Sequence, residues 1–247
     1  MQPHGLTQVW CADISTKNNS TEERMQGITK QTYSHQITEY IKERILAGEF
    51  APGDKVNEVL LASRLSISRA PIREALQLLV QEGLIVSTPQ RGKSIATLTS
   101  KEIRNSYFTG GVLEGAAAAS TIHMFTDDDF ARLKAVVDSM ADCVARDGDM
   151  DELATLDTAF HDVIFSRTDN QLLVELSRRA CQGISKFLLF RYWRTAFTPE
   201  EVLRRHKVVL EAMLTRDPVF IESTIRNHYV DSGRRMARWG TDMMPHP

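Results

Sequence analysis

The apolar positions of this chain fall into two regions with different periodicities. Residues 30–98 combine short segments of helical spacing with one pair of segments typical of a β-hairpin. Residues 100–240 show helical spacing throughout and hardly a strand-like segment. Because helices repeat about every 3.6 residues and strands about every 2, the first region predicts a small mixed unit and the second an all-helical one. The predicted fold class is therefore mainly α.

Three helical segments precede the hairpin in the first region. The first segment has isoleucines at helical spacing and ends at Gly48, a residue type that commonly terminates helices. The third follows Ser68, which can cap a helix N-terminus, and tolerates Pro71 in its first turn. This order of elements predicts a winged helix-turn-helix. The expected elements are helices over 37–46, 59–65 and 69–81 and strands over 84–86 and 94–96, with a turn over 89–92.

The second region has clear helix starts. Thr99 with Glu102, and Thr198 with Glu201, have the spacing of a capping box, in which two side chains satisfy backbone amides of the first turn. Thr126 precedes three aspartates, which the partial positive charge of a helix N-terminus favours. No fixed-period repeat is present, so we expect one antiparallel bundle of about six helices. They are predicted near 100–124, 127–147, 150–166, 171–195, 199–215 and 218–239.

These patterns predict a flexible N-terminal extension (1–28), a winged helix-turn-helix domain (29–98), an all-α domain (99–240) and a tail (241–247). No apolar run reaches the roughly 18 residues that a membrane span needs, and the start of the chain lacks a signal-peptide pattern. The three cysteines are far apart and odd in number, which disfavours a disulfide framework and fits a reducing cytoplasm. We therefore expect a cytoplasmic protein without a membrane partner.

A local basic surface is needed for any DNA contact, because the net charge is only −2. From Arg64 to Arg73 the chain carries three arginines and no acid. Arg69 and Arg73 share one helical face, and Arg91 and Lys93 lie at the predicted wing tip. Charge alone leaves DNA binding and a solvated basic face equally credible. The order of elements and the basic wing favour DNA, with the helix reading a groove and the wing touching the neighbouring backbone.

The stretch IKERILAGEFAPGDKVNEVLLASRLSISRAPIREALQLLVQEGLI, followed by RGKSIATLT, closely resembles the DNA-binding domain of the GntR family of bacterial regulators. The PG turn, LA..L..SR.P.REAL and EGL…RG are its most specific elements, over about residues 34–98. The resemblance implies that Ser68, Arg69 and Arg73 contact DNA. It also implies that the turn around Gly92 approaches the minor groove, which a residue without Cβ permits. The candidate DNA-binding residues are Ser68, Arg69, Arg73, Arg91, Gly92 and Lys93.

A second candidate site lies in the helical region, where Asp157, His161, His206 and His228 fall on apolar faces. Asp157 and His161 are neighbours on one helix. His206 and His228 lie at similar distances on either side of the turn near 216–217, so a rise of about 1.5 Å per residue places them at one height. One such histidine is more simply a hydrogen-bonded core residue, but three unpartnered imidazoles are costly to bury. The set predicts a divalent metal site suited to Zn²⁺, Ni²⁺, Mn²⁺ or Fe²⁺.

The helical region looks like the FCD ligand-binding domain of the FadR subfamily over about residues 102–240. The segments LDTAFH, RRHKVVLEAM and RNHYVDSGRRM carry the resemblance, and six helices suggest the VanR-like branch. It implies a metal that helps hold a small carboxylate effector. One departure is Gly110, where the family usually has an arginine four residues before the glutamate of Leu113-Glu114. An arginine there would pair with the effector, so either another arginine substitutes or the effector is smaller or less acidic.

Together these features predict a homodimeric transcriptional regulator, more often a repressor in this family, whose two reading heads bind palindromic operator DNA. A small-molecule effector, expected to be an organic acid bound near the metal, would modulate that binding through different affinities for two states. Two alternatives stay open. The bundle could be a metal-dependent hydrolase, although no general base or G-x-S-x-G motif is evident. The metal could instead be purely structural, or be itself the signal.

Overall fold

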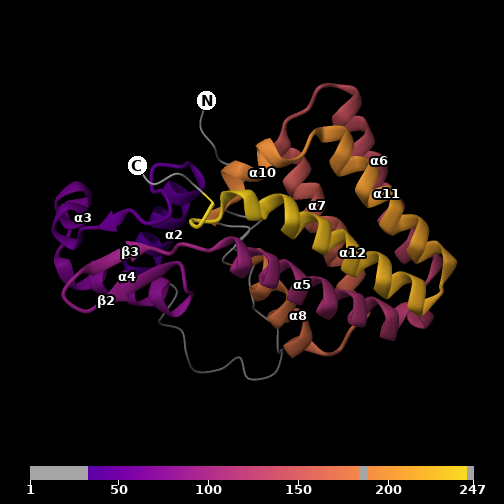
Figure 1. Cartoon of the computed structure of the whole chain (residues 1–247), viewed down its shortest axis with the longest axis horizontal. Helices are drawn as coiled ribbons and strands as arrows, with labels where there is room; N and C mark the ends of the chain where they lie inside the picture. Colours follow the sequence, from indigo (N-terminus) through magenta and orange to yellow (C-terminus); the bar gives the residue numbers. More distant parts are fainter. Residues whose placement is uncertain (1–32, 184–187, 244–247) are drawn as a thin grey trace, which may run out of the picture. The chain divides into compact units, whose positions relative to one another are not determined.

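The computed structural model describes residues 33–183 and 188–243, which form two compact units (Figure 1). The units divide between Ile95 and Ala96, close to the domain boundary that the sequence predicts. The predicted N-terminal extension, 1–28, lies outside the described residues.

Three helices and three strands make up the described part of the first unit, and they confirm the winged helix-turn-helix order. The sheet is antiparallel with strand order β1-β3-β2. The sequence predicts only the β2–β3 hairpin, because a two-residue strand is too short to show alternation. The elements are α2 (Tyr33–Leu46), β1 (Lys55–Val56), α3 (Glu58–Leu65), α4 (Arg69–Gln81), β2 (Ile85–Thr88) and β3 (Gly92–Ile95).

The core of the first unit lies between α2 and α4. Ile72, Leu76 and Leu79 of α4 recur at helical spacing and are completely buried. Burying side chains of this size stabilises the unit by roughly 1.5–3 kcal/mol each. The core therefore fixes the orientation of α4, and the opposite face of α4, with Arg69 and Arg73, is left exposed.

The second unit is helical throughout its described part, which confirms the predicted fold class. Capping boxes form at Thr99 and Thr198 as predicted, and a third forms at Thr126 with Asp129. The elements are α5 (Ser100–Thr121), η1 (Ile122–Met124), α6 (Asp127–Ala145), α7 (Met150–Phe165), α8 (Gln171–Arg178), η2 (Arg179–Gly183), α10 (Phe190–Ala196), α11 (Pro199–Thr215), α12 (Pro218–Met236) and η3 (Ala237–Trp239).

The prediction of one α-helix over 171–195 is wrong in its middle. Helix α8 ends at Arg178, and the backbone then adopts a wider π-helical turn in η2. Leu189, before α10, has φ −106° and ψ 8°, outside the α-helical range. Such single-turn π segments are often found at functional sites, and η2 places Cys181 against α5.

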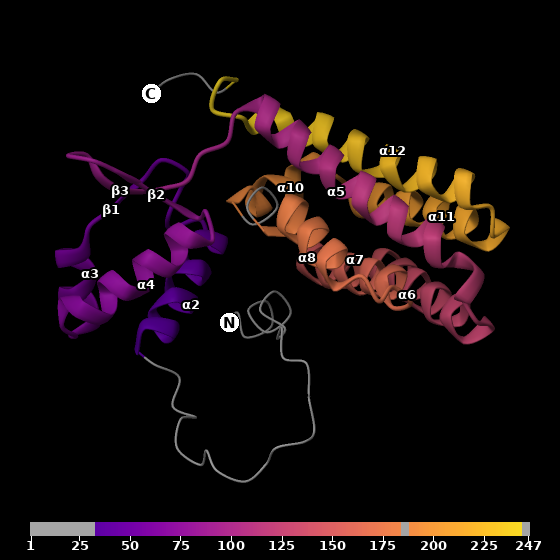
Figure 2. The ribbon, with the colours of Figure 1, turned by 90° about the horizontal axis from the view of Figure 1, so that it is seen from below.

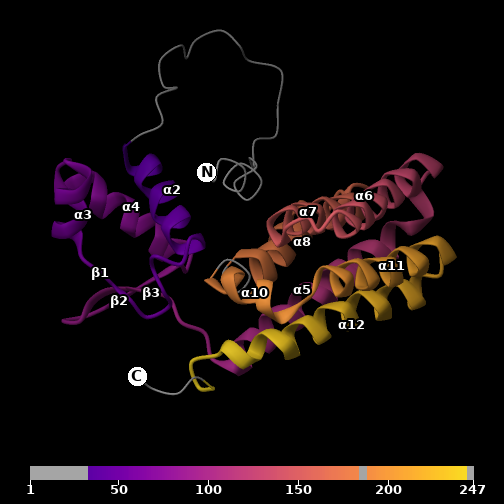
Figure 3. The ribbon, with the colours of Figure 1, turned by 90° about the horizontal axis from the view of Figure 1, so that it is seen from above.

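Helices α5 and α12 pack unusually closely and antiparallel, as Figures 2 and 3 show from opposite sides. Glycines permit this approach. A Cβ added at Gly111 would lie 2.6 Å from the Cβ of Tyr229, and one added at Gly233 would lie 2.8 Å from the Cβ of Tyr107. Both distances are shorter than real Cβ contacts, so larger residues would push the helices apart. The backbone of α12 is thereby held against the middle of α5.

Helices α11 and α12 form the predicted hairpin. Arg216 ends α11 in the left-handed conformation, with φ 58°, and the Asp217 carboxylate then caps α12 by accepting from the amides of Val219 and Phe220. This tight reversal sets the register between the two helices. No helix in the described part of the chain is long and apolar enough to cross a membrane.

The first described residues of the predicted tail are bonded to this unit. The Asp242 carboxylate accepts hydrogen bonds from the amide and the hydroxyl of Ser100, at 2.6 and 2.7 Å. The amide of Thr241 donates to the carbonyl of Leu98 at 2.9 Å. These bonds fasten residues after α12 to the first turn of α5.

Candidate functional site

The first candidate surface is built by the N-terminal turns of α4. Ser68 is the N-cap residue, but its hydroxyl makes no capping hydrogen bond, contrary to expectation. Ser68 is exposed, as are the side chains of Arg69 and Arg73, at 54% and 61%. The polar groups of this face are therefore accessible to a ligand, while the buried face of α4 holds them on a rigid element.

The wing contributes a second part of this surface. Gln90 and Gly92 both have positive φ, 62° and 83°, which turns the chain sharply between β2 and β3. No atom lies within 4 Å of a Cβ added at Gly92, so the space above this backbone is open. Arg91 is exposed beside it. A backbone without a side chain in open space suits close approach by another molecule.

Lys93 lies differently from the other candidate DNA-binding residues. The sequence places it at the wing tip, but its side chain is only 20% exposed, and its Nζ donates to the Glu58 carboxylate at 2.7 Å. The sequence gives little indication of this contact, because Glu58 is one of many acidic residues and lies far from Lys93 along the chain.

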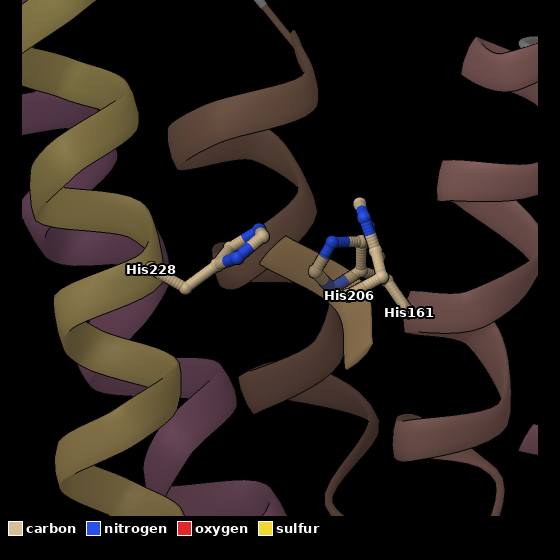
Figure 4. Close-up of side chains that lie close together, drawn as sticks. All are labelled: His161, His206 and His228. Atoms are coloured by element: carbon tan, nitrogen blue, oxygen red, sulfur yellow. The ribbon is translucent and has the colours of Figure 1, made fainter. Parts of the chain in front are cut away.

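The second candidate site is a cluster of three histidines from three helices. His161 of α7, His206 of α11 and His228 of α12 point toward one another (Figure 4). One nitrogen of each lies within 4.8 Å of the others. Small side-chain rotations would bring them into reach of a single ion, which bonds imidazole nitrogens at about 2.0–2.1 Å.

Asp157 lies at the edge of this cluster, one helical turn before His161. Its Oδ1 is 3.2 Å from Nε2 of His206 and 3.9 Å from Nε2 of His161. All three side chains are buried. The structure therefore places Asp157 beside two of the three clustered histidines, closer to His206 than to His161.

The surroundings of His206 indicate what its inner nitrogen can bind. Nδ1 lies 2.8 Å from the carbonyl of Val202, which can only accept, so Nδ1 carries the proton. In the neutral ring, the form that binds metals, Nε2 carries the lone pair, and this atom is buried without a hydrogen bond. It faces a carboxylate oxygen of Asp157 at 3.2 Å. Two electron-pair donors this close in a buried site are stabilised by a cation between them.

Glu114 of α5 orients a second histidine, a role that no pattern in the sequence predicts. It is completely buried, and its Oε1 lies 2.5 Å from Nδ1 of His161. Its Oε2 accepts a hydrogen bond from the Tyr229 hydroxyl at 2.6 Å. Burial, followed by the charge of Glu114, raises the pKa of Tyr229 well above 10.0, so this hydroxyl stays a donor. Carboxylates commonly hold metal-binding histidines in this way, directing the other ring nitrogen at the ion.

His228 is held by its backbone. Arg205 Nη2 donates to the carbonyl of His228 at 2.7 Å and to the hydroxyl of Ser232 at 2.6 Å, and Arg205 also pairs with Asp231. The pKa of His228 lies well below 6.5, first because burial disfavours its charged form, and the positive charge of nearby Arg205 disfavours that form further. Neutral imidazole is the form that binds metals.

A small cavity of about 30 Å³ adjoins the cluster. Gly110 packs against two of the residues that line this cavity, since a Cβ there would lie 2.9 Å from the Cβ of Cys181 and 3.4 Å from Cε1 of Tyr229. These side chains occupy the space that an arginine at 110 would enter. The cavity is lined by Tyr107, Asp157, His161, Cys181, Trp193, His228, Tyr229 and Ser232.

Comparison with protein families assigns both units. Residues 33–95 match the model of bacterial regulatory proteins of the gntR family, and residues 107–231, about half of the chain, match the FCD domain. The chain belongs to the GntR family of regulators with an FCD domain. The resemblance noted in the sequence is thereby confirmed.

Individual relatives agree with this assignment. The chain is 26% identical over 198 residues to the HTH-type transcriptional repressor RspR of Escherichia coli K12, covering 80% of this chain and 86% of that protein. It is 25% identical over 195 residues to the gluconate operon transcriptional repressor of Bacillus licheniformis, covering 77% and 79%. This GntR-family chain is therefore a DNA-binding transcriptional regulator with an effector-binding FCD domain, and not an enzyme.

Two solved structures share its fold. A GntR transcriptional regulator of Rhodococcus sp. RHA1 aligns with a TM-score of 0.64 and 21% identity, over 82% of this chain and 96% of that one. McbR/YncC of E. coli aligns with a TM-score of 0.58 and 19% identity, over the same shares of the two chains. The arrangement of elements is therefore that of known GntR regulators.

Proposed function

We propose that this regulator is a homodimeric, metal-containing repressor that a small anionic effector releases from a palindromic operator. The observation that carries the proposal is the pairing of two features in one chain. One is an exposed arginine-rich face on α4, and the other is a buried cluster of three histidines and Asp157 in the FCD domain. The first suits DNA, and the second suits a divalent cation.

In the reading head, Ser68, Arg69 and Arg73 would contact base edges and phosphates, and Arg91 and Gly92 would meet the neighbouring backbone. Arginine is suited to both roles because its fork of donors matches guanine edges and phosphate oxygens. Two heads related by a twofold axis would read the two halves of a palindrome.

The DNA-reading proposal is tested with Arg69→Ala and Arg73→Ala in the full chain. The probe is the duplex that the wild-type protein selects from random-sequence DNA, and binding is measured by fluorescence anisotropy. We expect each variant to bind it about 10-fold or more weakly, because one good arginine–base contact is worth roughly 1–3 kcal/mol. Arg226→Ala, an exposed arginine of α12, is the matched control and should bind as wild type. Wild-type affinity in both α4 variants would remove these residues from the interface.

In the FCD domain, Asp157, His161, His206 and His228 would together hold one divalent ion. Zn²⁺, Ni²⁺, Mn²⁺ and Fe²⁺ all suit a set of three imidazoles and one carboxylate. Bound there, the ion would supply a positive charge beside the cavity and so favour an effector with an anionic or strongly polar end.

Tyr107 marks where such an effector would bind. Its side chain is only 4% exposed and lines the same cavity as His161 and His228. Burial raises the pKa of Tyr107 well above 10.0, so the hydroxyl remains a donor. With Gly110 in place of an arginine, we propose that this hydroxyl and the metal together bind a small carboxylate.

Effector binding is tested by tryptophan fluorescence and by release of the selected duplex. Small carboxylates from formate upward in size are the probes. Tyr107→Phe should weaken the effective acid about 10-fold, since a buried acceptor loses its donor, and should leave operator affinity unchanged. Full operator affinity of the wild-type protein under every acid, with and without metal, would contradict the effector proposal but not the DNA-reading one.

A further inference from the structure

One carboxylate contacts three of the cationic side chains that the sequence marks as candidate DNA-binding residues. Oε1 of Glu58, the first residue of α3, lies 2.7 Å from Nζ of Lys93. Oε2 lies 3.1 Å from Nε of Arg73 and 3.7 Å from Nη2 of Arg69. Two of the partners belong to α4 and the third to β3, so a single side chain joins the reading helix to the wing.

The contacts of Glu58 differ in exposure. The Glu58 and Lys93 side chains are each only 20% exposed, whereas those of Arg69 and Arg73 are more than half exposed. The hydrogen bond from Lys93, opposed by partial burial and aided by Arg73, lowers the pKa of Glu58 below 4.5. Glu58 and Lys93 therefore form a fixed salt bridge between α3 and β3. The two arginines contact the same carboxylate but remain largely exposed to solvent.

The geometry of Arg73 allows it to keep this contact while binding DNA. It bonds Glu58 through Nε, which leaves the donors of its two terminal nitrogens for a base edge or a phosphate. A carboxylate behind a guanidinium restricts its rotamers, so less side-chain entropy is lost on binding. The same carboxylate repels phosphates and so opposes binding that depends on charge alone.

We propose that Glu58 is a positioning residue that holds Arg69, Arg73 and, through Lys93, the wing in the arrangement the operator requires. Its negative charge also lowers affinity for DNA of other sequences. Lys93 then links the wing to α3 through its salt bridge with Glu58 and does not contact a phosphate. This inference rests on the proposed DNA-reading function.

The experiment uses Glu58→Gln in the full chain, with Glu43→Gln as the control. Glu43 is an exposed acid of α2, so its replacement changes the net charge equally without touching the reading face. The probes are the duplex selected by the wild-type protein and a duplex of the same composition in scrambled order, each titrated at several salt concentrations. The measured quantity is the ratio of the two affinities.

Glu58→Gln should bind the scrambled duplex more tightly, with a salt slope steeper by about one unit, and should lower the affinity ratio roughly tenfold. Glu43→Gln should leave the ratio within about twofold of wild type. A ratio in Glu58→Gln equal to that of the control would overturn the inference while leaving the reading function intact. A wild-type protein that selects no sequence at all would instead defeat the reading function itself.

Two further variants separate position from charge and guard against misfolding. Glu58→Asp keeps the charge but withdraws the carboxylate by one methylene, so it should lower operator affinity without raising affinity for the scrambled duplex. Lys93→Met should lower operator affinity by less in the Glu58→Gln protein than in the wild-type protein. The reason is that either substitution alone already breaks the salt bridge between Lys93 and Glu58. Additive losses of affinity would show that Lys93 contacts DNA independently, and would overturn its role as the link between the wing and α3. Thermal unfolding of each variant identifies any loss of fold.

Discussion

Among single residues, Glu114 gives the sharpest test of the metal centre because it is not itself a proposed ligand. Glu114→Gln keeps size and burial but presents either an amide donor or a neutral oxygen to Nδ1 of His161, which loses its charged acceptor. We expect the affinity for the divalent ion to fall about 10–100-fold, as for other partners of metal-binding histidines. The measurement is competition with a chromogenic chelator.

The matched control is Glu175→Gln, an exposed acid of α8 in the same unit. It should leave the metal affinity unchanged. Equal affinities in the two variants would mean that Glu114 only fills space. Circular dichroism of the Glu114 variant shows whether the bundle is intact when the affinity is read.

The four proposed metal ligands can be found from the sequence, whereas Glu114 cannot. Asp157 and His161 share a helical face four residues apart, and the hairpin turn places His206 level with His228, so periodicity alone brings the four together. Glu114 is different, because its partners come from α7 and α12 and no local pattern links it to them. Its one signal is that it is the only acid within the small-residue stretch GGVLEGAAAA.

At the scale of elements, the start of α6 depends on a buried carboxylate. Asp129 accepts from the amide and hydroxyl of Thr126 and from Nε of Arg167, each at 2.8 Å. Desolvation raises the pKa of Asp129, but these hydrogen bonds and the charge of Arg167 outweigh it and leave the pKa below 3.8. A carboxyl group with a lowered folded pKa stabilises the fold above its unfolded pKa and loses that contribution as the pH falls through the folded value.

Asp129→Asn should therefore lower the free energy of unfolding by about 1–3 kcal/mol at pH 7, where the wild-type carboxylate is charged and bonded. The difference between the two proteins should shrink as the pH drops below about 3.9, the usual unfolded pKa of aspartate. Urea unfolding across a pH series measures it. A difference that stays constant with pH would show that the charge of Asp129 contributes nothing.

The contact between α5 and α12 gives a second prediction for elements. Gly111→Ala would place a methyl 2.6 Å from the Cβ of Tyr229 and 3.3 Å from the Cα of Arg226. Since backbone cannot rotate away, the helices must separate, at a cost of typically about 1–3 kcal/mol. Thermal unfolding should show a lower midpoint. Ala116→Ser, at an exposed position of α5, should unfold like wild type, and an equal midpoint in both variants would refute the tight packing.

Elements with local start and stop signals were predictable, and those without were not. Thr99, Thr198 and Asp217 cap helices where the sequence placed the starts, because capping is a contact between residues three apart or fewer. The π-helical turn of η2 carries no such signal, since its sequence keeps helical apolar spacing. Strand β1 exists only through pairing with β3, a contact between distant residues.

For the whole molecule, the two proposed sites lie in different units. Removal of the metal should therefore first lower the stability of the unit that holds the histidine cluster. The histidine cluster joins α7, α11 and α12. An ion bound at about 100 times its dissociation constant would stabilise that unit by roughly 2.7 kcal/mol. We expect a chelator to lower its unfolding midpoint by about 5–10 °C.

His206→Ala and His123→Ala make this prediction specific. His206 belongs to the cluster, whereas His123 is an exposed histidine of η1 in the same unit. The chelator should shift the midpoint of the His123 variant as in wild type and leave that of the His206 variant unmoved. Equal shifts in both variants would place the stabilising ion elsewhere.

The same chelated protein separates a sensing metal from a structural one. If the ion binds the effector, metal-free wild-type protein should still bind the selected duplex but should no longer be released by the acid that releases the metal-bound protein. The reason is that an effector shifts an equilibrium only by its differential affinity for two states, and loss of the ion removes much of that affinity. An unchanged acid response without metal would assign the ion a structural role. Release of the duplex by chelation alone would make the metal itself the signal.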